Sequence, residues 1–574
     1  MDRFTELRQR PFVALIEHFA RRLFASEEEQ GSGGGMGLGL GAVLAILASP
    51  GAFASIFMLD KYSALLQFLR GTHVDPIQRS PADEYFFVVL SMTITGMVMV
   101  TRWNRLFPDR RDFTNLAVLP IPIRNIFLAN FAALLGLALL FAVDVNCVSV
   151  FLFPLFVTMS KESFPLLLRV GVANACSVIA ASLFSFFGIF GLVGLMTLLL
   201  PRRVFRPASI AVRIVLVVGL LTEFYSNIFL QLFAAHAPGQ ANAFVRWIPS
   251  YWFLGIYERM AGIAKPEMTA LGSQALFSLG AIVILSTLVY AICYRRIFVR
   301  LPESFDTMGG SRPLFAVHLP ERWTKWVFRS SFERACSSFV AKVLARSEQH
   351  LMFLGAYLGI GLVIIAQSAT DAVTAPGQKL PAAEHLAIPL LMAFVTISGL
   401  RFVFDVPAVL DANWIFQAAA TTASPEPRLI VRRLLLRATL TWEIAILLPL
   451  SILRMGWTSG LLYVASTAAL TVLFADVLVM RFHKIPFTCK TEVDIKQLIF
   501  RMLGALFGVL VLVPGLAALQ HWMLLHPLRF LDLAVLLAVG WYAIRRYQRE
   551  NLGGQPAMKF QDGPAPQFEL LKLT

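Results

Sequence analysis

The sequence predicts an all-α polytopic membrane protein with about twelve transmembrane helices in two six-helix halves, each preceded by an amphipathic interfacial helix. Its 574 residues are 57% hydrophobic and only 15% charged, whereas soluble domains carry about 25% charged residues. The mean hydropathy is +0.69. Apolar runs of about 20 residues, the length of a membrane-crossing helix, recur along the chain. A soluble fold could not bury this much apolar surface.

Twelve apolar runs have the length of a span. The predicted first half, residues 37–296, contains the runs 37–59, 85–101, 125–156, 168–200, 209–233 and 271–294. The predicted second half, residues 350–546, contains the runs 350–367, 386–403, 437–455, 459–480, 498–520 and 529–544. Because the third and fourth runs are long, eleven or thirteen spans also fit the sequence.

The basic residues predict the orientation of these spans. The net charge is +15, and lysine and arginine gather in the cytoplasmic segments of membrane proteins. With the N-terminus inside, roughly four in five basic residues fall on the inner side. We therefore expect both termini, including the tail 547–574, to be cytoplasmic. Because membrane topology explains the positive charge, we expect the chain to lie in a lipid bilayer and to bind no nucleic acid.

Two inner segments have the helical spacing of amphipathic helices. The N-terminal segment, residues 1–36, and the linker, residues 297–349, each place apolar residues on one face beside arginines. These residues are Phe12, Leu15, Ile16, Phe19 and Leu23 in the first segment and Phe328, Phe332, Cys336, Phe339 and Val343 in the second. We expect helices in the inner membrane interface; soluble helices that pack on a loop are the alternative.

Short similarities suggest that the two halves are repeats. The first half ends in YAICYRR at Tyr290–Arg296, and the second ends in YAIRR at Tyr542–Arg546. The loops after the second and eighth spans carry proline and aspartate at the same spacing, Pro108 with Asp112 and Pro407 with Asp411. Such internal repeats are common in transporters. Chance similarity among apolar helices is the alternative.

The inner segment from Trp103 to Phe131 is charged and rich in proline. Its sequence FPDRRDF is suited to a short helix, but the following LPIPI cannot remain helical, because proline lacks a donor and favours extended predecessors. The result is a stiff charged element attached to two spans, which could transmit force from a soluble partner. The alternative is an ordinary basic loop that sets only topology.

This segment resembles the inner loop of bacterial ABC exporter permeases of the type-2 class, where an arginine and aspartate stretch and a Leu-Pro-Ile or Leu-Pro-Val sequence precede the third span. The matching residues are Arg110, Arg111, Asp112, Leu119, Pro120, Ile121, Arg124 and Ile126. Asn130 departs from the family, which often has lysine there. The resemblance implies a bacterial inner-membrane permease whose loop docks as a coupling helix on a separate ABC ATPase subunit, where ATP and Mg²⁺ bind.

The second half matches this pattern less well. Its segment from Asp405 is longer and lacks Leu-Pro-Ile. Asp411 and Trp414 are the candidate residues for an equivalent contact with the ATPase.

The chain carries no nucleotide-binding motif of its own. A P-loop needs a Gly-rich loop with Lys and Ser or Thr after a strand, and the Gly31–Gly41 run has neither the lysine nor the strand. The cysteines are scattered without a CxxC pair, which indicates no zinc site. We expect no catalytic residue, cofactor or metal in this chain.

Four carboxylates fall inside predicted spans, where a charge is costly and often marks an ion or proton path. They are Asp144, Glu223, Glu443 and Asp476. By the predicted boundaries Glu223 and Glu443 are the deepest, whereas Asp144 and Asp476 lie nearer to span ends. The alternative for each is a structural contact between helices. The aromatic outer segment Arg246–Gly262 is expected to anchor at the headgroup level or to form a gate.

The sequence leaves three classes of function to consider. The first is the permease of an ATP-driven exporter with a separate ATPase. The second is a secondary transporter coupled to protons or sodium through Glu223 and Glu443. The third is a membrane-embedded enzyme, which is disfavoured because the chain has no HExxH or comparable catalytic pattern.

Overall fold

The computed structural model describes only part of the chain. The described residues are 11–24, 48–56, 58, 61–62, 75–103, 106, 121–159, 161, 163–233, 247–300, 330–373, 383–408, 415–416, 418, 426–480, 482, 484–489 and 503–552. They belong to two compact units, Met1–Ser311 and Arg312–Thr574. The boundary between the units falls within the predicted linker, residues 297–349.

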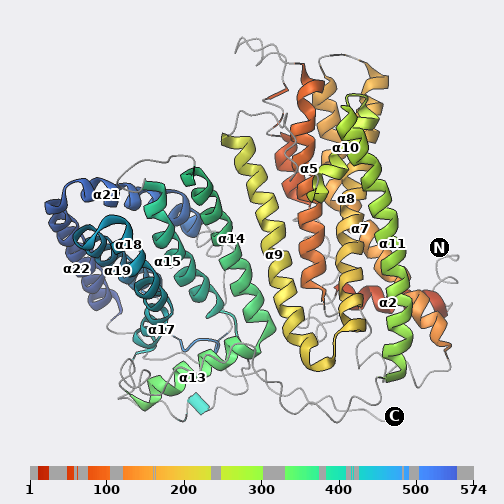
Figure 1. Ribbon diagram of the computed structural model, residues 1–574. Coiled ribbons are helices and arrows are strands. Elements are labelled where there is room, and N and C mark those ends of the chain that lie inside the picture. The colour runs from red at the N-terminus through yellow and green to blue at the C-terminus, as the bar shows by residue number, and fades with distance from the viewer. Residues whose placement is uncertain are drawn as a thin grey trace. The chain divides into compact units, whose positions relative to one another are not determined.

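The first unit is a bundle of helices (Figure 1). Its described helices are α2 (Pro11–Phe24), α5 (Pro76–Thr101), α7 (Ile123–Thr158), α8 (Phe164–Leu199), α9 (Arg202–Phe233), α10 (Pro249–Ala261) and α11 (Pro266–Arg300). Helix α5 packs against α8 and α10 in the interior of the unit. Hydroxyls join these helices: Ser185 on α8 donates to the carbonyl of Met92 on α5 at 3.0 Å. Such small polar contacts are typical of packed membrane helices.

The second unit is also helical. Its described elements are α13 (Ser331–Arg346), α14 (Glu348–Val373), α15 (Ala383–Val403), α17 (Pro427–Trp442), η6 (Glu443–Leu447), α18 (Leu448–Met455), α19 (Trp457–Val479), η7 (Gly508–Leu512), α21 (Val513–Leu525), η8 (Pro527–Arg529) and α22 (Phe530–Leu552). Helix α15 lies at the centre of this unit, between α14, α19 and α21.

Nine helices among the described residues are long and apolar enough to cross a membrane, or ten if α13 and the start of α14 are counted as one bent span. The protein is therefore an integral multi-pass membrane protein. Nine of the twelve predicted runs correspond to these helices. Of the others, 37–59 lies mostly outside the described residues, 350–367 forms most of α14, and 529–544 forms α22, whose last turns carry Arg545 and Arg546.

The segment expected to anchor at the headgroup level instead forms α10, a helix of 13 residues. This prediction was wrong for its central aromatic residues, because Phe253 and Tyr257 are fully buried. A helix of this length cannot span a bilayer, which needs about 20 residues. It forms a tight hairpin with α11, where an added Cβ on Gly255 would meet the Gly272 nitrogen at 2.6 Å. Trp247 before the helix remains 80% exposed.

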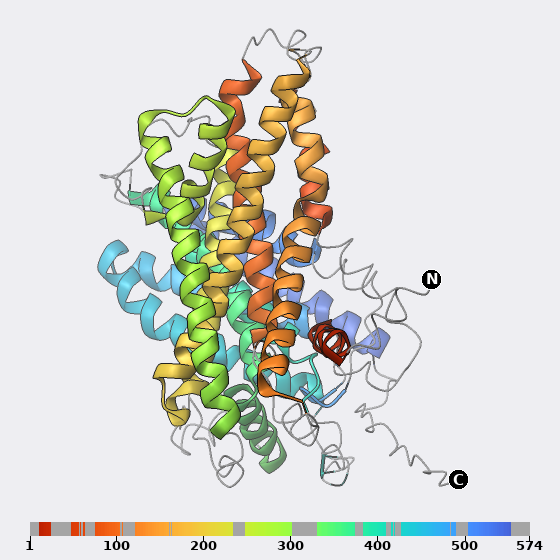
Figure 2. The ribbon, with the colours of Figure 1, turned by 90° about the vertical axis from the view of Figure 1, so that its right-hand side faces the viewer.

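Both predicted amphipathic segments contain helices. Figure 2 views α2, in dark red, nearly along its own axis, while α7 runs along the bundle. The apolar face of α2 packs on α7, with Leu15 and Phe19 buried. In the second unit, α13 meets α14 at an angle of 83°, and its residues Cys336 and Val340 are buried. The apolar faces of both helices are thus used at least partly for packing within the protein.

Two π-helical turns interrupt spans in the second unit, and each ends two positions before a proline. The turn η6 precedes Pro449, and η7 precedes Pro514. Proline has no N–H, and its ring clashes with the carbonyl of the residue four positions earlier. A wide turn relieves this clash while the helix continues.

The ends of the two proposed repeats differ in their surroundings. Tyr290 in the first unit is fully buried, whereas Tyr542 in the second unit is 67% exposed. The shared YAI sequence therefore lies in a packed environment in the first unit and on the surface of the second.

Candidate functional site

We call the inner segment from Trp103 to Phe131 the coupling segment. The structure describes only its two ends. Arg110, Arg111, Asp112, Leu119 and Pro120 lie outside the described residues. At the first end, Trp103 is 2% exposed and its ring lies 5.4 Å from the guanidinium of Arg213 on α9, a favourable cation–π distance. Leu106 is also fully buried. The buried side chains of Trp103 and Leu106 thus hold the start of the coupling segment in the bundle.

The second end of the coupling segment is the start of α7. Ile121 is half-buried and Arg124 is exposed in the first turn of the helix. Helix α7 has no acidic residue in this turn, although negative charge is favoured at a helix N-terminus and positive charge is not. The charge of Arg124 is therefore unfavourable for the helix at this position.

The departure at Asn130 has a structural explanation. Its side chain is 1% exposed and donates a hydrogen bond of 2.6 Å to the Tyr290 hydroxyl on α11. The Tyr290 ring stacks on Phe127, with ring centroids 4.9 Å apart. These contacts join α7, which begins at the coupling segment, to α11.

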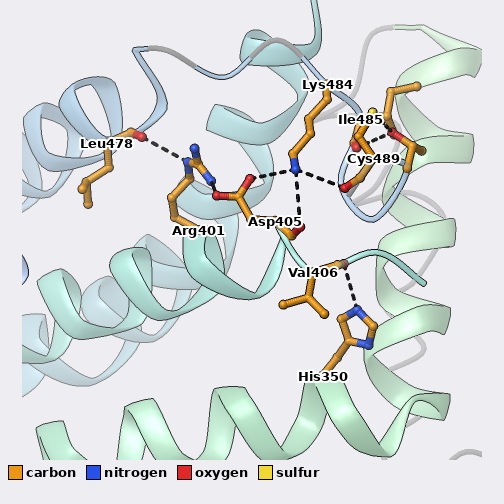
Figure 3. Close-up of polar contacts among 9 residues, drawn as sticks. His350, Arg401, Asp405, Val406, Leu478, Lys484, Ile485 and Cys489 are labelled. Carbon is orange, nitrogen blue, oxygen red and sulfur yellow. Dashed lines mark hydrogen bonds and ion pairs between the residues drawn. The ribbon is translucent and has the colours of Figure 1, made fainter. Parts of the chain in front are cut away.

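The proposed second-half equivalent of the coupling segment is Asp405–Phe416, which we call the counterpart segment. It begins in a compact polar cluster at the end of α15, and we call this cluster the α15 anchor. It consists of Arg401, Asp405 and Lys484 with the backbone that they contact (Figure 3). The Lys484 ammonium lies 3.0 Å from one Asp405 carboxylate oxygen, and Arg401 pairs with the other. Arg401 also donates to the Leu478 carbonyl of α19 at 3.2 Å. The anchor thus ties α15 to α19 and to the loop that follows α19.

Burial by itself raises the pKa of Asp405, but the charges of Arg401 and Lys484 outweigh it and hold that pKa below its usual value. The three side chains are between 12% and 15% exposed. A charge that is largely buried in this way needs compensation. One carboxylate between two cations supplies it and fixes the backbone at the start of the counterpart segment.

Phe487 also holds the start of the counterpart segment in place. Its nitrogen donates to the Phe404 carbonyl, and its carbonyl accepts from the Ala408 nitrogen, both at 3.1 Å. Its φ is 69°, an uncommon value for a bulky residue. The ring contacts Phe404 and the imidazole of His350. His350 Nε2 lies 3.1 Å from the Val406 carbonyl, and its Nδ1 is hydrogen-bonded to the Ser347 hydroxyl. Residues 404–408 are therefore held on several sides.

Farther along, the counterpart segment reaches α13. Phe416 packs edge-on against Phe339, with ring centroids 4.8 Å apart. Asp411 and Trp414 lie outside the described residues. The amphipathic helix and the counterpart segment thus form one surface at this end of the second unit.

Asp476 is a structural contact. It pairs with Arg432 on α17 and accepts from the Trp541 ring nitrogen on α22 at 3.2 Å. It lies close to the end of α19, as its position in the sequence predicts. Its partners favour the structural alternative over a pathway role.

Two other carboxylates lie on long helices of the first unit. Glu223 lies within α9, which continues to Phe233, and is half-buried beside Ser250. Asp144, expected near a span end, instead lies close to the middle of α7, which is one unbroken helix from Ile123 to Thr158. One of its oxygens, Oδ2, is buried without a hydrogen-bond partner.

Glu443 is deep, as predicted. It is fully buried near the middle of the span Pro427–Met455. It accepts a hydrogen bond of 3.0 Å from the Thr471 hydroxyl on α19. The structure does not bring it together with Asp476, whose partners lie elsewhere on α17 and α22.

Two further buried carboxylates, Asp83 and Glu84, were missed from the sequence because they precede the predicted run 85–101. Helix α5 begins at Pro76 and carries both inside the bundle. Asp83 pairs with Lys61 at 2.6 Å and also accepts from the Tyr62 hydroxyl. Glu84 is fully buried near Tyr257 and Ser177. The proline at the start of α5, after an aspartate cap, is the signal that could have moved the boundary.

In the part of the chain that the structure describes, no group of three histidine, cysteine, aspartate or glutamate residues could hold a metal ion. Comparison with known proteins gives no further guide: no family model, curated protein or solved structure matches the chain.

Proposed function

We propose that this protein is the membrane-spanning permease of an ATP-driven exporter, and that a separate ABC ATPase subunit drives it. The observation that carries the proposal is the charged, proline-rich segment between α5 and α7, with its resemblance to the coupling loop of type-2 permeases. The anchored Trp103 and the exposed Arg124 at its two ends support it. A segment fixed at both ends to spans can transfer a push from a partner to those spans.

The α15 anchor is proposed as the second contact region. Residues 404–408 are held by ion pairs and by Phe487, so a force applied to the segment that follows would reach α15 directly. The contact surface would include α13, which Phe416 touches. In this proposal the ATP and Mg²⁺ lie on the partner, the termini face the cytoplasm, and the membrane is the bacterial inner membrane.

The proposal is tested with the chain and the ATPase that co-purifies with it in mild detergent. Arg111→Ala and Asp112→Ala should abolish stimulation of ATP hydrolysis by the permease while membrane insertion is unchanged. Arg454→Ala is the matched control, because this exposed arginine lies at the end of α18, on the predicted outer side. Full stimulation in both loop variants, or the absence of any co-purifying ATPase, would contradict the proposal.

A second candidate is an ion-coupled secondary transporter. The observation that favours it is Glu443, a fully buried carboxylate near the middle of a span. Transport in vesicles that contain no ATPase, lost when the proton gradient is collapsed, would support this candidate over the first.

A further inference from the structure

Glu443 lies in a polar cluster inside the second unit, which we call the Glu443 site. It consists of Glu443 on η6, Thr467 and Thr471 on α19, and Gln520 on α21. Thr471 donates to Glu443 Oε1 at 3.0 Å. The Gln520 amide nitrogen donates to the Thr467 hydroxyl at 3.2 Å, one helical turn from Thr471. All four residues are 1% exposed or less.

Two acceptor oxygens in this site lack a partner. They are Glu443 Oε2 and Gln520 Oε1. Buried polar atoms are nearly always hydrogen-bonded, and exceptions in native proteins mark an unseen ligand or a functional role. The unmatched atoms are both oxygens, so the site lacks a positively charged or hydrogen-donating occupant.

No basic side chain among the described residues compensates Glu443. On the elements packed around it, Arg401 pairs with Asp405 and Arg432 with Asp476. Arg433 pairs with Glu333, Arg437 lies six residues along the same helix, and Arg454 is exposed at the end of α18. Tyr463 on α19 is the titratable neighbour that interacts with Glu443.

The π turn helps to explain how Glu443 comes to this position. Glu443 is the first residue of η6, which accommodates Pro449 on the following turn. A π turn widens the helix and changes the direction of the side chains that it carries, and such turns are frequent at functional sites. An ionised carboxylate without a cation is strongly disfavoured in the membrane interior.

We propose that the Glu443 site binds a proton in the resting protein, with Glu443 held as a neutral carboxylic acid. Its Oε1 is then the carbonyl oxygen that accepts from Thr471, and Oε2 carries the proton. Release of this proton requires water or another acceptor to reach Oε2. The site does not depend on the proposed ATPase, and it is present whether ATP or an ion gradient drives transport.

The test uses the full chain in mild detergent with dicyclohexylcarbodiimide, an apolar reagent that adds to protonated carboxyl groups. Mass spectrometry should find Glu443 modified at neutral pH at least about tenfold more than Glu267, an exposed glutamate at the start of α11. An exposed glutamate is protonated in fewer than about 1 in 100 molecules at this pH. The adduct should be absent in Glu443→Gln and weaker at high pH.

An infrared measurement and a Thr471→Val variant provide two further tests of the protonated state of Glu443. The infrared C=O band of a protonated carboxyl group should lose intensity in Glu443→Gln at neutral pH, whether or not the reagent reaches the site; an unchanged band overturns the proposal. Thr471→Val removes the donor that favours the ionised form, so the pH dependence of labelling should move upward. If sodium in place of choline suppresses labelling and this infrared band together, the occupant is a sodium ion, and the proposal of a resting proton is wrong.

Discussion

Replacing Asp405 with asparagine tests the α15 anchor directly. The substitution preserves the shape of the side chain but removes the negative charge between Arg401 and Lys484. Both cations would remain in place, each with 15% of its side chain exposed, and each would lack its main compensating charge. We therefore expect the second unit to lose stability.

The size of this effect follows from the burial. Removing one partner of a buried ion pair costs about 3–5 kcal/mol, because the remaining charge is uncompensated. Asp405 is 12% exposed, so screening by water is partial, and asparagine retains one acceptor. We expect a loss near the lower end, about 3 kcal/mol. For a unit of this size the loss corresponds to a Tm lower by about 6–12 °C.

Thermal unfolding in mild detergent, followed by intrinsic fluorescence, measures this change. Asp532→Asn is the matched control, because this carboxylate on α22 is exposed; its effect should stay within about 0.5 kcal/mol. Lys484→Met should cost less than Asp405→Asn, since Arg401 still compensates the carboxylate. Equal Tm values for wild type and Asp405→Asn at neutral pH would refute the assigned role of the anchor.

The pH dependence gives an independent check. Burial acts to raise the pKa of Asp405, but its two cations lower it to a value below the ordinary one. A carboxyl group with a lowered folded-state pKa stabilises the fold fully above its unfolded pKa, about 3.9, and this contribution disappears as the pH falls through the folded-state pKa. The Tm difference between wild type and Asp405→Asn should therefore be constant above about pH 5 and shrink below about pH 4.

Two other predictions concern the first unit. Gly255→Ala should destabilise it by about 2–3 kcal/mol, because the new Cβ would meet backbone atoms of α11; Gly280→Ala, with open space around its Cβ, should cost nothing or stabilise α11 by up to about 1 kcal/mol. Equal unfolding temperatures for the two variants would contradict the tight hairpin. Asn130→Ala and Tyr290→Phe should each destabilise, and their double-mutant cycle should give a coupling of about 1 kcal/mol. Strict additivity would mean that the 2.6 Å hydrogen bond contributes nothing.

The sequence alone determined the class of this protein and the positions of most of its spans. Hydropathy is a property of each segment, and a run of about 20 apolar residues has one stable state in a bilayer, a helix. The prolines after η6 and η7 also mark local breaks that the chain imposes by itself. The boundary of α5 was misplaced because Asp83 and Glu84 look like loop residues when only local polarity is considered.

The tertiary structure decided which polar side chains meet. Arg401 and Lys484 are far apart in the sequence but share one carboxylate, and Glu443 meets Thr471 on another helix. Aromatic residues that suit a membrane interface instead pack inside the bundle on α10. These outcomes depend on the rotation and axial position of one helix against another. Packing across the whole unit sets both quantities, and the sequence of a single helix does not encode them.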